Sequence, residues 1–189
     1  ADNSSIDVTL SETAFGSDSA SGELDVNDFS FTISGGVATL VANNPSTMTG
    51  SDKTFTLGIS LSTLADGNEN LTVNPVDDSI YDALGNESLT KQSNNVVRLN
   101  DFVAPVITNV VGVETNTINP TENAFIQLVI SEQLASAKVD VVSKLGDSII
   151  NSYSIQKDRI NITLEAGFVS GDSIEITADA LTDLSNNVG

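Results

Sequence analysis

A chain of 189 residues with 26 acidic and 7 basic side chains carries a net charge of −19, which repels nucleic acid and anionic membranes. It contains neither cysteine nor histidine, so thiol catalysis, disulfide bonds, histidine acid–base chemistry and ordinary zinc sites are excluded. The same negative charge attracts divalent cations, and no segment is long and apolar enough to predict insertion into a membrane.

The first half of the chain shows the two-residue alternation that is typical of half-buried β-strands. Strands are predicted at residues 6–10, 29–33, 37–41, 55–61, 71–73 and 96–99, with polar loops at 13–23 and 43–52 and a turn at Gly35-Gly36. The side chains expected to point into a core are Ile6, Val8, Leu10, Phe55, Leu57 and Ile59.

The second half continues the same pattern. Strands are predicted at residues 106–113, 126–130, 139–142, 149–155, 160–164 and 174–178. The inward side chains expected here are Ile126, Leu128, Ile130, Ile160, Ile162 and Leu164. No segment has helical periodicity over a sufficient length, and short strands separated by Gly, Asn and Asp predict an all-β fold.

Two stretches of the chain occur twice. DDSIYDALGNES (residues 77–88) resembles ADALTDLSNNVG (residues 178–189), and aligning Asp82 with Asp183 also aligns Asn86 with Asn187. Upstream, residues 6–12 (IDVTLSE) resemble residues 126–132 (IQLVISE). Repetition at this spacing predicts two copies of one β-domain, each of roughly 90–100 residues, the usual size of an immunoglobulin-like sandwich. The proline-containing segment NDFVAP (residues 100–105) is the expected boundary, which gives domains at residues 1–103 and 104–189.

The two copies differ at their ends. The second copy has a predicted strand at residues 106–113 before its IQLVISE segment, whereas the first has only ADNSS there. The first copy has a closing strand at residues 96–99, and the second has no counterpart. One explanation is that the chain is a fragment of a longer array, or that the fold can spare short edge strands. The other is that a neighbouring molecule supplies the missing strand.

Several segments resemble the bacterial immunoglobulin-like (Big-type) repeats of very large surface proteins. They are DVNDFSFTISGGVATL (residues 25–40), TFTLGISL (54–61), GNENLTVNPVDDSIYDALGN (67–86) and the linker LNDFVAPVI (99–107), with looser matches in ISEQL and DALTDLSNN. The resemblance implies two tandem immunoglobulin-like β-sandwiches, an extracellular or cell-surface setting and often bound calcium, and it implies no catalysis.

In such a sandwich, the IQLVISE strand and the strand before the acidic loop run in the same direction. This topology predicts that Glu132 lies near Asp183 and Asn187, with Asp101 of the linker beside them. The equivalent set in the first copy is Glu12, Asp82 and Asn86, with Asp77, Asp78 and Asp2 nearby. Carboxylate and amide oxygens are the ligands that calcium prefers, so both sets are candidate calcium sites. The alternative is that these Asp and Asn residues are turn formers that bond their own backbone.

The sequence is compatible with three functions, none of them enzymatic. The first is an adhesive or structural module that forms a stalk or surface array stiffened by calcium. The second is a subunit of an extracellular filament or sheath that assembles by β-strand complementation. The third is a carbohydrate-binding or spacer module of a secreted enzyme. The expected partners are neighbouring copies or adjacent repeats, and surface glycans for the third function. Paired carboxylates for glycoside hydrolysis are disfavoured, because they lie in turn sequences and the chain has few aromatic residues to stack a sugar.

Overall fold

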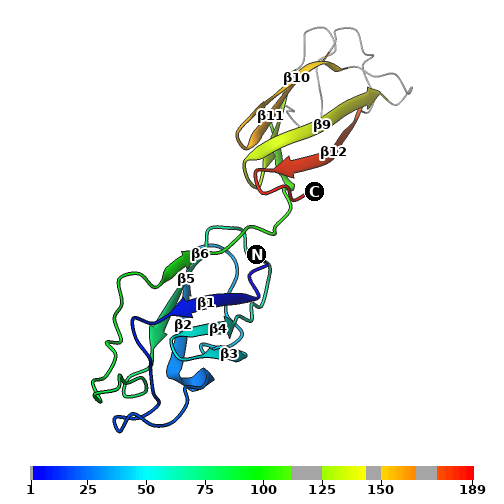
Figure 1. Cartoon of the computed structure of the whole chain (residues 1–189). Coiled ribbons are helices and arrows are strands. Elements are labelled where there is room, and N and C mark those ends of the chain that lie inside the picture. Colours follow the sequence, from blue (N-terminus) through cyan, green and yellow to red (C-terminus); the bar gives the residue numbers. More distant parts are fainter. Residues whose placement is uncertain (1, 112–124, 144–149, 165–173) are drawn as a thin grey trace. The chain divides into compact units, whose positions relative to one another are not determined.

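The computed structural model describes residues 2–111, 125–143, 150–164 and 174–189 (Figure 1). Its contacts divide the chain into two compact units, Ala1–Phe102 and Val103–Gly189, which we call unit 1 and unit 2. The described residues form antiparallel sheets, and their one helix is the short 3-10 turn η1 (Val26–Asp28), so the fold is all-β. The described part of the chain holds no helix that is long and apolar enough to cross a membrane.

Unit 1 consists of two three-stranded sheets. One has the strand order β1-β4-β3 and the other has the order β2-β5-β6. The strands are β1 (Ser5–Thr9), β2 (Phe29–Ser34), β3 (Met48–Ser51), β4 (Thr54–Gly58), β5 (Asn70–Pro75) and β6 (Val96–Arg98). Apolar side chains from both sheets share one hydrophobic core.

The predicted inward side chains of unit 1 are confirmed. Phe55, Leu57 and Ile59 are buried, and the Phe55 ring lies 6.1 Å from that of Phe29 on the opposite sheet. The three apolar residues of the first strand are only half-buried, although they pack against the same core. Alternation therefore identified the correct face, and the partial exposure shows that this side of the core is less well covered.

The structure differs from three predictions in unit 1. No regular strand forms at residues 37–41: the N–H groups of Val37 and Ala38 donate to the carboxylate of Glu69, each at 2.8 Å. The rest of the segment pairs with residues 60–62 only through the Leu40–Leu61 bridge and two backbone bonds, Val41 N–H to the Ser60 carbonyl and Ser62 N–H to the Thr39 carbonyl. Residues 43–52, predicted as a loop, contain strand β3, which pairs with β4. The strand predicted at residues 55–61 ends early, at Gly58.

Unit 2 has a four-stranded sheet of order β10-β11-β8-β7 and a two-stranded sheet of β12 and β9. Its strands are β7 (Ile107–Val111), β8 (Phe125–Ile130), β9 (Leu134–Ser143), β10 (Ile150–Gln156), β11 (Arg159–Leu164) and β12 (Ile174–Asp183). The six inward side chains predicted on β8 and β11 are at most 2% exposed, which confirms that prediction. Strands β9 and β12 are longer than predicted, and predicted strand residues 112, 113 and 149 lie outside the described residues.

The two units arrange most of their strands in the same order. The order β1-β4-β3 in unit 1 corresponds to β8-β11-β10 in unit 2, and the pair β2-β5 corresponds to β9-β12. In the described residues, β6 of unit 1 and β7 of unit 2 have no counterpart in the other unit. The difference at the ends of the two copies that the sequence indicates therefore appears in the sheets as well.

Candidate functional site

The repeated acidic stretch folds into a five-residue turn in unit 1, which we call the first Asp–Asn loop (residues 82–86). The Oδ1 atom of Asp82 accepts hydrogen bonds from the N–H groups of Leu84 (2.7 Å) and Asn86 (2.8 Å). Its Oδ2 atom accepts a third from the side-chain Nδ2 of Asn86, at 2.8 Å. The backbone closes the loop, because Asp82 N–H donates to the Asn86 carbonyl at 3.0 Å. One carboxylate thus organises the whole turn.

The second Asp–Asn loop (residues 183–187) in unit 2 repeats this arrangement bond for bond. Asp183 accepts from the N–H groups of Ser185 (2.7 Å) and Asn187 (2.8 Å) and from Nδ2 of Asn187 (2.8 Å). The fourth residue of both loops lies in the left-handed region, Gly85 with φ +78° and Asn186 with φ +69°. Glycine and asparagine are the residues that adopt this conformation most readily, so the two sequences satisfy one backbone requirement in different ways.

The two loops differ in their surroundings. Asp82 is partly exposed, and hydrogen bonds from the Asn86 side chain and then from loop N–H groups lower the pKa of its carboxyl. Asp183 is the last residue of β12 and only 1% exposed. A buried carboxylate depends more strongly on its hydrogen-bond donors than an exposed one, because water cannot replace them. We therefore expect the second loop to be the more sensitive to substitution.

In unit 2 the structure brings Glu132 and Asp183 together. Glu132 follows β8, and a carboxylate oxygen of each residue lies within 4.8 Å of the other. Asn187 is held against Asp183 by the bond described above. The fourth predicted ligand, Asp101, belongs to unit 1, where it forms a bridge with Asp66, so its part in a site with Glu132 and Asp183 stays a prediction. Two carboxylates this close favour a cation between them at neutral pH.

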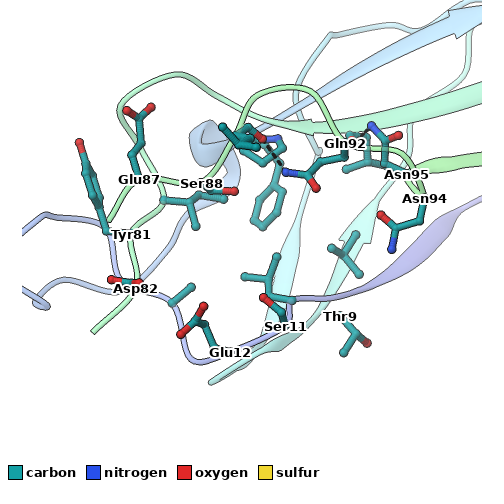
Figure 2. A pocket seen from close by; sticks show the side chains of 18 of the residues that line it. Thr9, Ser11, Glu12, Tyr81, Asp82, Glu87, Ser88, Gln92, Asn94 and Asn95 are labelled. Carbon is teal, nitrogen blue, oxygen red and sulfur yellow. Dashed lines mark hydrogen bonds between the residues drawn. The ribbon is translucent and has the colours of Figure 1, made fainter. Parts of the chain in front are cut away.

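In unit 1 the predicted ligands lie at a surface groove of about 730 Å³. Glu12, Asp82 and Asn86 are among its lining residues, and Figure 2 shows Glu12 and Asp82 at one end of it. In the described residues of this unit, no group of three carboxylates offers oxygens close enough to share a metal ion. The unit 1 set is therefore poorer in charge than a typical calcium site, and calcium binding there stays a prediction.

Three further acidic residues are predicted near the unit 1 ligands, and two of them, Asp2 and Asp78, accept hydrogen bonds from neighbouring side chains or backbone. Asp2 accepts hydrogen bonds from the hydroxyl and the N–H of Ser4, which lower the pKa of its carboxyl. Asp78 accepts from the hydroxyl of Tyr81, and this bond, with the carboxylates around it, raises the pKa of Tyr81 to about 12. Asp77 is exposed. These interactions fit the turn-forming role that the sequence leaves open.

Sequence reasoning missed Glu69, which is fully buried in unit 1. Burial raises the pKa of its carboxyl, but N–H donors from Ala38, Asp66 and Val37 and its own N–H outweigh burial and lower that pKa below its usual range. The same carboxylate binds the N–H groups at the start of the segment predicted as a strand at residues 37–41. A glutamate between two asparagines carries no pattern that predicts burial, so periodicity alone could not have identified it.

No protein-family model, curated protein or solved structure that we compared with the chain matches it. Function is therefore inferred from the geometry of the two units.

Proposed function

We propose that the chain is a non-enzymatic structural module of an extracellular stalk or surface array, with each unit acting as one immunoglobulin-like spacer. The observation that carries this proposal is that two units of similar size use the same strand order and the same Asp–Asn loop. Each unit also buries its own hydrophobic core, so the two can act as separate mechanical elements in series.

The chemistry of the acidic residues supports the same function. Each loop carboxylate accepts three hydrogen bonds from its own loop. These bonds stabilise the turn, so the carboxylate has a structural role and not a role in proton transfer. The net charge of −19 keeps such a module soluble and apart from anionic surfaces. Calcium at Glu132 and Asp183 would then stabilise unit 2.

A spacer has to resist tension, so we propose single-molecule pulling of the chain between two handles. Two separate unfolding events are expected. Each should release roughly 300–350 Å of chain, since about 90–100 residues extend by about 3.3–3.6 Å each. A single event that releases the whole chain, or unfolding without measurable force, would contradict the proposal.

Matched core variants assign the two events. Leu57→Ala should lower the unfolding force of one event only and Ile162→Ala that of the other, because each side chain is fully buried in the core of its own unit. If either variant weakened both events equally, the units would not be independent spacers.

A further inference from the structure

Strand β1 of unit 1 has an open edge. Leu10 N–H donates to the Lys53 carbonyl and Ile59 N–H to the Ser4 carbonyl, both at 2.8 Å, so the even-numbered residues of this strand bond towards β4. In an antiparallel ladder the alternate residues direct their N–H and C=O groups the other way. Those of Asp7 and Thr9 therefore point away from β4, where no strand of the described chain pairs with β1. An open edge of this kind is a template for another strand.

Unit 2 shows what kind of strand covers the equivalent edge. Strand β8 holds the position that β1 holds in unit 1, next to β11 as β1 is next to β4. On its other side β8 pairs with β7 in antiparallel register, from Ile107 opposite Ile130 to Val111 opposite Gln127. The sequence of β7, ITNVV, is uncharged and rich in β-branched residues. The counterpart of the β1 edge is thus filled by an uncharged, apolar strand.

The groove of unit 1 runs beside this open edge. Its lining includes every residue from Ile6 to Ala14 on one side and Asn94 to Val97, which include the start of β6, on the other. Figure 2 shows Thr9, Ser11 and Glu12 on the first side and Gln92, Asn94 and Asn95 on the second. Because Ile6, Val8 and Leu10 are only half-buried, a strand added to β1 would cover apolar surface as well as pair its backbone.

The chain itself carries a strand suited to this edge. Strand β7 is the outer strand of its sheet, and Ile107, Val110 and Val111 are each 40% or more exposed. Uncharged outer strands also include β2, β3 and β10. The Phe31 N–H of β2 already donates to the Asn43 carbonyl, β3 is short and mostly polar, and the isoleucines of β10 already pack against the core of unit 2. Pairing β1 with a second β1 would place Asp7 near its own copy, which like-charge repulsion disfavours. An uncharged β7 avoids that repulsion in a chain of net charge −19.

We propose that the open edge of β1 binds the β7 edge of a second copy of this chain, so that one sheet continues across two molecules. The interface goes beyond the spacer function proposed above, because it joins separate chains. It uses a different surface on each partner, so a pair of bound copies still has one free β1 edge and one free β7 edge. Such an arrangement is head-to-tail and extends into filaments or closes into rings.

The test uses two variants that each block one edge. Thr9→Pro removes an N–H group on the open side of β1, where proline is tolerated in an edge strand, and Val110→Lys places a charge in the exposed β7. Thr9→Lys serves in place of the proline variant if that one does not fold. Thr49→Lys on the exposed part of β3 is the matched control. Circular dichroism and thermal unfolding establish that each protein is folded before its association is measured by sedimentation velocity.

The wild type and the control should associate increasingly with concentration, and each blocked variant alone should stay monomeric. An equimolar mixture of the two blocked variants should form a one-to-one dimer and nothing larger, because the intact β7 of one meets the intact β1 of the other. A monomeric wild type at millimolar concentration, association of either blocked variant as strong as that of the wild type, or a mixture that stays monomeric would each overturn the proposal. Because the pulling experiment uses single molecules, its outcome is independent of this one.

Discussion

Replacing Glu132 by glutamine should separate the role of calcium from the role of the turn in unit 2. The substitution removes one charge of the Glu132–Asp183 pair and leaves the three hydrogen bonds of the second Asp–Asn loop in place. One oxygen of each carboxylate lies within 4.8 Å of the other, and at that largest separation two unit charges repel by about 0.9 kcal/mol in bulk water and by about 3.5 kcal/mol at an effective dielectric constant of about 20. In a chelator, Glu132→Gln should therefore raise the free energy of unfolding of unit 2 by about 1–3 kcal/mol.

Added calcium should stabilise the wild type much more than it stabilises Glu132→Gln. An ion bound to the native protein stabilises it by about 2.7 kcal/mol at a hundredfold excess over its dissociation constant, and Glu132→Gln should lose most of that gain. The assay is thermal and urea unfolding of both proteins, with excess calcium and with chelator. Asp140→Asn is the control, since it removes one charge from an exposed residue of β9 that lies six positions from Leu134, the register partner of Asp183.

Two outcomes would refute this reasoning. If calcium and chelator gave the same unfolding curves for the wild type, the pair would hold no calcium and the turn-forming role would be sufficient. If Glu132→Gln destabilised unit 2 in chelator, the two carboxylates would not repel as their separation implies. The control variant should keep the full response to calcium; losing it would point to a general charge effect and not to this pair.

The remaining predictions concern stability. Leu57→Ala and Ile162→Ala should each lower the free energy of unfolding by about 2–5 kcal/mol in urea titrations, because both side chains are fully buried, and a loss below about 1 kcal/mol would contradict the packing described. Gly85→Ala should destabilise unit 1, because φ is +78° and the added Cβ would overlap the Asp18 carbonyl oxygen, whereas Asn186→Gly should be nearly neutral on thermal unfolding. The lowered pKa of Glu69 means that its ionised form stabilises unit 1 above the unfolded pKa of 4.5 and that this contribution is lost as pH falls through the lower folded pKa. Glu69→Gln should therefore reduce stability at pH 7 and flatten its decline in acid, and an unchanged pH profile would argue against this role.

The sequence predicted the strands of the core well and the irregular segments poorly. Alternation identifies β8 and β11 because every second side chain of these two strands enters the core. At residues 37–41 the same pattern is misleading, because the carboxylate of Glu69, distant in sequence, accepts the first two N–H groups of the segment. Strand β3, with the sequence MTGS, forms through pairing with β4 in spite of its composition. Long-range partners of this kind are not encoded in local periodicity.

The sequence predicts that the repeated acidic stretch forms either a turn or a metal site, and the hydrogen bonds of Asp183 are relevant to both predictions. A carboxylate has about four acceptor positions, and Asp183 already uses three of them within its own loop. It can therefore offer a cation one position, on Oδ2, and the Asn187 amide nitrogen already faces that oxygen. Since calcium takes six to eight oxygens, Glu132 and Asp183 alone form too small a set, and a calcium ion held by them needs further ligands from backbone carbonyls of unit 2 or from water.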